Sequence, residues 1–267
     1  MKKLLITLAL LLPLAAAAQS TTEGSVRASA GVDVKIRKGL HLSVEEEIRM
    51  NGAFKSLGRL QTNVKVEYKP VKWMKLGLGY SLINPYSYTN MGFKDTRHRV
   101  FFDVGAHYTT YSHFSFSIRE RIQMTHRTGT YNVYQTTPYK MELKSRVGVE
   151  YKGWTYFEPG VFFELRTALN DPWGEPDMDR GMQTKDDGTT YYYYTPTGYT
   201  HVYNSRYRAI FRTDIKLSDH HVLEPYAYVD YLTAYKIDTN SEGTRLFKAE
   251  YDDHFRISIG ISYTFKF

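Results

Sequence analysis

An alternating run of eleven residues begins at position 26 and reads Val26-Arg27-Ala28-Ser29-Ala30-Gly31-Val32-Asp33-Val34-Lys35-Ile36. Every second residue, from Val26 to Ile36, is apolar, and the residues between them are charged, polar or glycine. Helical spacing would scatter both groups around a cylinder, whereas the two-residue period of a strand places them on opposite faces. The run therefore predicts a β-strand that separates an apolar environment from a polar one.

Ten more segments show the same period. Each has the nine or more residues that a tilted strand needs to cross a bilayer. Over all eleven segments, 2 of 65 positions on the apolar face are charged, against 31 of 63 on the other face. If the apolar faces contact lipid, only a closed barrel leaves no backbone amide unpaired, so we predict an all-β, transmembrane antiparallel β-barrel. The further segments are 40–50, 60–69, 73–83, 99–108, 114–124, 140–151, 156–167, 204–217, 222–233 and 254–267.

The connections favour a membrane barrel over a soluble sandwich, which also alternates. Short turns alternate with longer loops, as in outer-membrane barrels, and aromatic residues such as Trp73 and Trp154 gather beside the turns, as in an interfacial girdle. We expect ten to twelve strands. Bacterial barrels usually have even counts, so either segment 26–36 lies inside a ten-strand barrel or one segment is miscounted. The longer loops are predicted at 51–59, 84–98, 125–139, 168–203 and 234–253.

The two ends of the chain predict its destination. Residues 1–18 read as a signal peptide, with Lys2 and Lys3, an apolar stretch and four alanines ending at Ala18. Residues 19–267 then form one barrel domain in the outer membrane of a Gram-negative bacterium. The final Phe267 resembles the signal read by the barrel-assembly machinery, the first expected partner. Outer-membrane lipid or lipopolysaccharide is the second, and nucleic acid is not expected for an exported chain.

A family resemblance rests on several segments in order. They are Leu42-Ser43-Val44-Glu45-Glu46-Glu47-Ile48-Arg49, Val66-Glu67-Tyr68-Lys69, Lys75-Leu76-Gly77-Leu78-Gly79-Tyr80 and Arg97-His98-Arg99-Val100. With the terminal Phe267, the chain resembles the uncharacterised outer-membrane barrels catalogued as domain of unknown function 2490. The resemblance covers nearly the whole mature chain and implies an outer-membrane barrel, with no catalytic residues to transfer.

The charged face predicts a lumen crossed by ion pairs and narrowed by aromatic residues such as Phe101, Phe162, Tyr226 and Tyr228. We interpret the chain as a narrow, anion-preferring pore, because inward Lys and Arg outnumber acids by 19 to 12, or as a structural component of the envelope. We expect no cofactor, no metal and no catalytic residue. The lumen-facing charges singled out are Glu47, Arg49, Asp103, Arg119, Arg121, Arg146, Glu164, Arg166, Arg206, Arg208, Arg212, Asp214, Asp230 and Arg256.

Glu46 and Glu120 are the two charges on the apolar face. A lipid-facing carboxylate is costly near the bilayer midplane. A β-bulge that turns each side chain inward is the simplest explanation. A protein–protein contact or a protonated pair is the alternative.

Two other functions remain open at this point. A lipid hydrolase or acyltransferase would need a histidine beside a serine or acid, and His107 near Asp103 or His254 at the last segment are the candidates. A surface adhesin or glycan binder would use the loop 168–203, which contains Tyr191 to Tyr194. The favoured interpretation of that loop is a hairpin that folds back and extends the strands.

Overall fold

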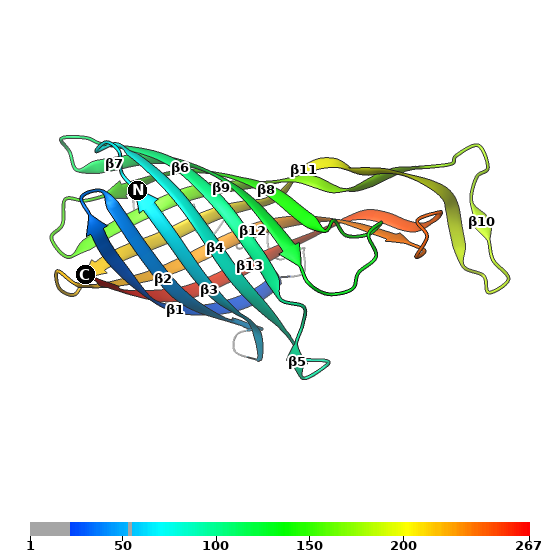
Figure 1. The fold of residues 1–267 in the computed structure, drawn as a ribbon, viewed down its shortest axis with the longest axis horizontal. Coiled ribbons are helices and arrows are strands. Elements are labelled where there is room, and N and C mark those ends of the chain that lie inside the picture. Colours follow the sequence, from blue (N-terminus) through cyan, green and yellow to red (C-terminus); the bar gives the residue numbers. More distant parts are fainter. Residues whose placement is uncertain (1–21, 53–54) are drawn as a thin grey trace, which may run out of the picture.

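The computed structural model describes residues 22–52 and 55–267. It shows a closed β-barrel of eleven long strands (Figure 1), which confirms the predicted barrel of ten to twelve. The signal peptide predicted at 1–18 lies outside the described residues. Two short strands, β5 (Gly92–Phe93) and β10 (Gln183–Thr184), pair only with neighbouring strands in the long connections. The barrel strands are β1 (Thr22–Arg37), β2 (Leu40–Asn51), β3 (Ser56–Tyr68), β4 (Met74–Ser87), β6 (Arg97–Thr109), β7 (Phe114–Arg127), β8 (Tyr139–Tyr151), β9 (Phe157–Pro176), β11 (Thr190–Lys216), β12 (His221–Thr239) and β13 (Arg245–Lys266).

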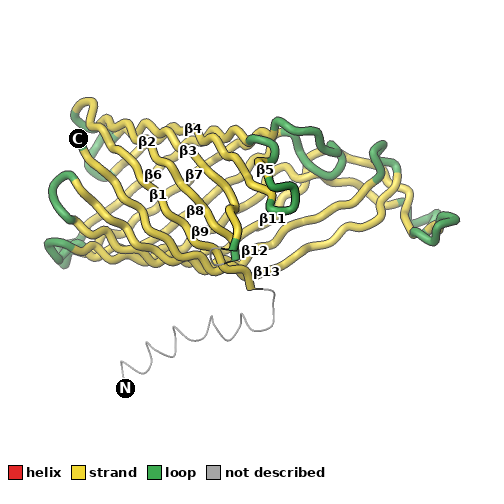
Figure 2. Tube along the Cα trace, turned by 90° about the horizontal axis from the view of Figure 1, so that it is seen from below, coloured by secondary structure: helices red, strands yellow, loops and turns green. Residues whose placement is uncertain are grey.

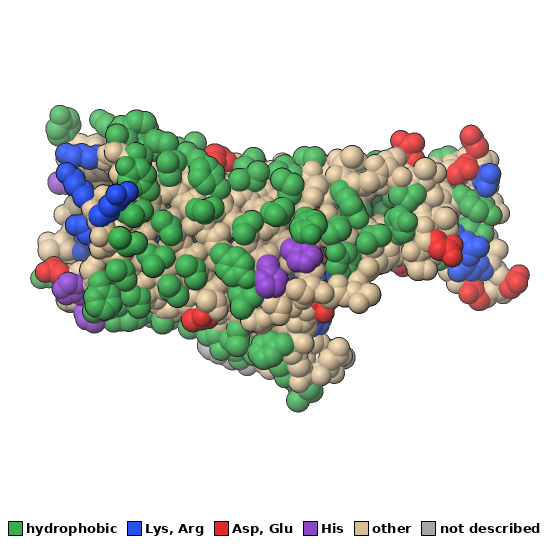
Figure 3. Space-filling model, viewed as in Figure 1, with side chains coloured by type: hydrophobic (Ala, Val, Ile, Leu, Met, Phe, Trp, Pro, Cys, Tyr) green, Lys and Arg blue, Asp and Glu red, His purple; other side chains and the backbone are tan. Residues whose placement is uncertain are grey.

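The alternation of the sequence becomes the two sides of the barrel wall. In β1, Val32 and Val34 are exposed on the outside, whereas Arg27 is 5% exposed and faces the lumen. Figure 3 shows hydrophobic side chains spread over the outer wall, with charged side chains concentrated toward the two ends of the molecule. In the described residues no helix is long and apolar enough to span a bilayer.

The barrel closes through a parallel seam between its first and last strands. β1 pairs antiparallel with β2 and parallel with β13, from Thr22 opposite Phe255 to Asp33 opposite Lys266. An odd number of strands in an otherwise antiparallel ring requires one such parallel pair. Both explanations offered for the odd count are therefore wrong: segment 26–36 lies in the wall, and no segment was miscounted.

Four strands continue past the barrel as an extension on the long-loop side (Figures 1 and 2). β8 pairs with β9 only as far as Ala168, yet β9 runs to Pro176 and pairs with β11. β12 and β13 also continue, to Thr239 and from Arg245. The loops predicted at 168–203 and 234–253 are therefore mostly strand, and the hairpin alternative describes 168–203 correctly.

Candidate functional site

The lumen is crossed near its middle by a group of buried side chains, here called the central layer. Glu164 is 2% exposed and Asp230 is fully buried, although both are carboxylates in the interior of a barrel. Eleven strands lie between the small barrels that side chains fill and the large ones that enclose a channel, so the side chains of the layer determine how far this lumen is filled. Its members are Phe101, Asp103, Arg121, Arg146, Phe162, Glu164, Arg206, Arg208, Tyr226, Tyr228 and Asp230.

Aromatic rings enter the central layer because glycines opposite them leave room. Phe162 is paired with Gly148 on the neighbouring strand, and a Cβ at Gly148 would lie 1.9 Å from its ring. Phe101 covers Gly79 in the same way, at 2.1 Å. Tyr226 opposite Gly260 is the third such pair. Because each glycine has no side chain, the ring opposite it can lie over the glycine's own strand and extend toward the axis of the lumen.

Carboxylates in the central layer are matched by arginines. Glu164 accepts hydrogen bonds from Arg146 at 2.6 Å, Arg206 at 3.1 Å and Arg119 at 3.2 Å. Asp230 is bound by both Nε and Nη2 of Arg208. Such bidentate, charge-assisted pairs are the strongest hydrogen bonds available to side chains.

The same arginines lie over the aromatic rings. Arg121, which binds Asp103 through two nitrogens, has its guanidinium carbon 4.0 Å from the centre of the Phe101 ring. Arg208 lies 4.4 Å from the centre of the Tyr228 ring. Cation–π contacts of this kind lock rings and arginines into one packed unit.

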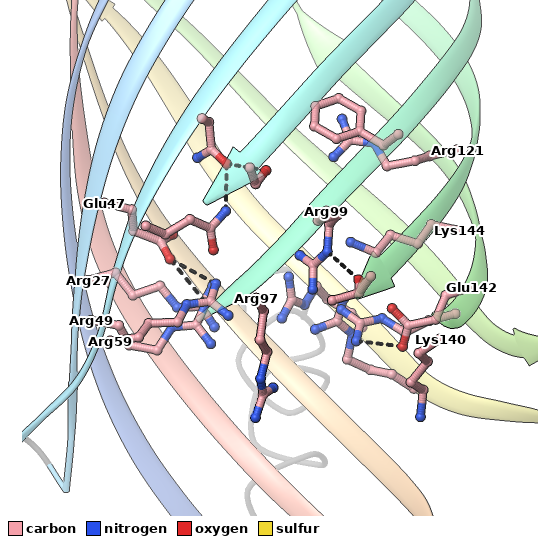
Figure 4. Close-up of a pocket in the computed structure, with 18 of the residues that line it drawn as sticks. Arg27, Glu47, Arg49, Arg59, Arg97, Arg99, Arg121, Lys140, Glu142 and Lys144 are labelled. Carbon is pink, nitrogen blue, oxygen red and sulfur yellow. Dashed lines mark hydrogen bonds and ion pairs between the residues drawn. The ribbon is translucent and has the colours of Figure 1, made fainter. Parts of the chain in front are cut away.

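A cavity of about 550 Å³ lies on the long-loop side of the central layer and is called the arginine chamber. Figure 4 shows its basic side chains pointing into a common space from opposite walls. Of the described residues, fourteen Lys or Arg but only three Glu line it. A separate cavity of about 300 Å³ lies toward the short turns and is called the turn-side cavity. The central layer supplies the adjoining surfaces of both cavities.

Comparison with known proteins agrees with the sequence resemblance. The family model described as "Protein of unknown function (DUF2490)" matches residues 28–266. The chain belongs to the DUF2490 family. No curated protein matches the chain.

The fourteen charges singled out in this DUF2490 chain come from eight strands and lie on the lumen side of the wall. Eight of them form or adjoin the central layer, and Glu47, Arg49, Arg166 and Arg256 line the arginine chamber. Arg212 lies toward the short turns, where it bridges Glu150 and Glu224. Asp214 has one buried carboxylate oxygen without a hydrogen-bond partner among the described residues.

Glu46 and Glu120 of this DUF2490 chain face outward. Their strands keep an unbroken register with both neighbours at these positions, so the predicted β-bulge is wrong. Each carboxylate lies opposite a hydroxyl residue instead. Glu46 is paired with Thr62, and Glu120 accepts a hydrogen bond of 2.6 Å from Ser145. A hydroxyl partner reduces the cost of an outward carboxylate without turning it into the lumen.

Neither histidine considered for catalysis has a carboxylate placed to orient its imidazole ring. His107 lines the turn-side cavity, but the carboxylate of Asp103 is bound by Arg121 and lies 3.5 Å from Lys65. His254 lies 4.0 Å from the exposed Glu23. In neither arrangement does the imidazole donate the short hydrogen bond to a carboxylate that orients a catalytic histidine.

The tyrosine run of the extension packs within the protein. Tyr194 is buried with Ile237 and Leu246 in a small apolar core, and burial raises the pKa of its hydroxyl to about 12. The rings of Tyr191 and Tyr193 lie within 5.6 Å of each other, at an interplanar angle of 77°. Arg245 lies over the Tyr191 ring and Arg180 over the Tyr193 ring, at 5.0 and 4.9 Å. One face of each ring is therefore already covered by an arginine, which leaves less ring surface for stacking on a sugar.

Sequence reasoning missed several basic residues of the arginine chamber. Lys144 and Arg99 occupy inward positions of segments that the alternation had already identified, so the signal was present. Arg97 and Arg127 lie just beyond the predicted segments, in the strand ends that continue toward the long loops. Their grouping depends on which residues of neighbouring strands lie opposite each other, and the sequence does not state this.

Proposed function

We propose that this protein is an outer-membrane β-barrel whose lumen is sealed in the isolated protein. Its working surfaces are then the arginine chamber and the extension at the long-loop end. The proposal replaces the open-pore interpretation and assigns the barrel itself an anchoring role in the envelope. No catalytic step is part of it.

The observation that carries the membrane placement is the outward surface of the barrel. Large apolar side chains such as Leu78, Val161 and Ile259 are 62%, 49% and 54% exposed. Soluble monomers rarely expose contiguous apolar patches of more than a few hundred Å². Lipid removes the cost of that exposure, and aromatic residues at the short-turn end, such as Trp73 and Trp154, suit the interface between lipid and water.

The central layer supports the sealed lumen. Its charged members are paired with each other and its rings are held over glycines, so no member is free to swing aside without breaking a buried ion pair or a cation–π contact. Breaking a buried pair is costly because it leaves an uncompensated charge. The packed side chains of the layer therefore close the lumen, whereas an open pore would contain water at this level.

Two measurements on the processed protein test the proposal. Fractionation should recover it in the outer membrane, with heat-modifiable migration on gels. Purified protein in planar bilayers should then remain silent at voltages that open small porins. Steady single-channel conductance by the wild-type protein would overturn the sealed lumen, and recovery as free protein between the two membranes would overturn the placement.

A further inference from the structure

The arginine chamber places like charges directly opposite each other on neighbouring strands. Arg27 of β1 is paired with Arg49 of β2, and Arg49 is paired in turn with Arg59 of β3. One carboxylate, Glu47, contacts Arg49 and Arg59, at 3.3 and 3.0 Å. Like charges directly opposite in a sheet are destabilising, so a row of three arginines with one acid is an unusual way to fill a lumen.

A second row crosses the opposite wall. Arg121 lies opposite Lys144, Lys144 opposite Arg166, and Arg166 opposite Arg206, over the strands β7, β8, β9 and β11. A third pair, Arg97 opposite Arg127, lies nearer the long loops. Figure 4 shows members of the first two rows facing each other across the cavity.

Several of these cations have no acidic partner in the described part of the chain. Lys144 is 8% exposed, and none of the described carboxylates lies within 4.0 Å of its ammonium group. Glu164 and Glu142 nearby are already bound by Arg146 and Arg166. Arg27, 5% exposed, has no carboxylate partner among the described residues: it donates to the hydroxyl of Ser258 and lies over the Tyr228 ring, and its buried Nε has no hydrogen-bond partner.

From these facts we propose that the arginine chamber binds a compact, multivalent oxyanion of the phosphate type. Two rows of guanidinium groups on facing walls suit a ligand with more than one anionic group, because each row can bind one group. Guanidinium donors match the oxygens of phosphate, and a buried unpaired ammonium supplies a point charge. The volume of about 550 Å³ lies in the range of small-molecule sites.

This inference deepens the proposed function by naming the ligand of the chamber, and it is tested separately from the seal. Purified protein in detergent is titrated with inorganic pyrophosphate at constant ionic strength, and thermal unfolding is followed. Pyrophosphate is expected to give a saturable rise in Tm, larger than the gradual, non-saturating rise that sodium chloride of the same ionic strength gives through screening. A second arm compares lipopolysaccharide with its dephosphorylated form, so that a lipid phosphate and a free phosphate are distinguished.

The decisive variant is Lys144→Met, which keeps the volume and removes an unpaired charge. Its apparent Kd for pyrophosphate should rise by on the order of tenfold or more, the loss of one charge-assisted hydrogen bond. Without ligand, its Tm should be equal to or above that of the wild type, because like-charge repulsion is relieved. Lys152→Met in the turn-side cavity is the matched control and should retain the pyrophosphate response.

Each possible result either supports or overturns the proposed site. The site is supported if either phosphate source gives a response that Lys144→Met weakens and Lys152→Met retains. The arm that responds shows whether the bound phosphate is free or belongs to a lipid. Absence of a saturable response to both sources, or an equal response in both variants, overturns it. If Lys144→Met fails to fold, Arg99→Gln gives the same test, because Arg99 also lines the chamber and has no carboxylate partner among the described residues, donating instead to the hydroxyl of Thr125. Conductance data bear on the seal alone, so the two proposals fail independently.

Discussion

The central layer and the arginine chamber adjoin in one lumen, yet they treat charge in opposite ways. In the layer, Glu164 is bound by three arginines, and Asp230 is bound by Arg208 through two nitrogens. In the chamber, arginines lie opposite arginines, and Lys144 has no acidic partner among the described residues. The same alternating strands build both regions. In the account proposed above, balanced charge makes the partition, and unbalanced charge gives up stability for the capacity to bind an anion.

The largest expected effect comes from unbalancing the layer. Glu164→Gln leaves Arg146, Arg206 and Arg119 without their shared carboxylate, and breaking a buried ion pair costs about 3–5 kcal/mol. The free energy of unfolding in urea should fall by that amount. Glu250→Gln, which removes an exposed pair with Lys248 in the extension, is the control, and should cost about 0–1 kcal/mol. Equal losses in the two variants would contradict the distinction between layer and surface.

A smaller effect is expected from filling the space beneath a ring of the layer. Gly148→Val places side-chain atoms where Phe162 lies, and overpacking of this kind costs about 1–3 kcal/mol. Thermal unfolding measures the loss. Gly105→Ala is the matched control, because a Cβ at this inward glycine would meet its nearest atom at 3.4 Å. If Gly148→Val is as stable as the control, the ring is not held as described.

Salt should act on the chamber more than on the layer. The Debye length falls from about 30 Å at 0.01 M to about 3 Å at 1 M ionic strength, so counterions that enter the chamber screen the repulsion along the rows. The wild-type Tm should therefore rise with sodium chloride. Arg49→Gln, which interrupts the row of Arg27, Arg49 and Arg59, should flatten that slope. A slope unchanged in this variant would mean that the rows do not repel.

The smallest effect concerns the two carboxylates on the outer wall of the barrel, Glu46 and Glu120, which lie in neither the layer nor the chamber. Replacing both Glu46 and Glu120 by Leu should raise the free energy of unfolding by on the order of 1 kcal/mol in total, because outward carboxylates are mildly unfavourable in lipid. Unfolding in lipid vesicles checks this. Loss of a defined oligomer in the double variant would instead assign these residues to a protein contact.

The sequence predicted the strands and their faces because period-two alternation is a local property. Segment 26–36, for example, already separated Arg27 from Val26 and Ala28. It did not predict the parallel seam, because pairing between β1 and β13 joins residues more than 200 positions apart. The glycines under Phe101 and Phe162 were visible as inward positions, but their pairing depends on strand register. The arginine rows also depend on strand register, so the sequence did not predict them either.

The extension is a second feature that the alternation of the sequence did not predict, for a different reason. The alternation weakens after Ala168 and before Asn204, where the register of β9 with β11 shifts several times, so a loop was the natural prediction. The strands persist because Tyr194, Ile237 and Leu246 give the extension an apolar core of its own. Prolines at 172, 176 and 196 fit these irregular pairings better than a regular ladder.

The most direct test of a sealed barrel in the membrane uses the absence of cysteine from the sequence. Thr136→Cys lines the arginine chamber and Ser117→Cys lines the turn-side cavity. A membrane-impermeant maleimide added to intact cells should label only Thr136→Cys, and Ser117→Cys should react once the outer membrane is opened. Labelling of both variants at similar rates in intact cells, or of Ser117→Cys alone, would contradict the account.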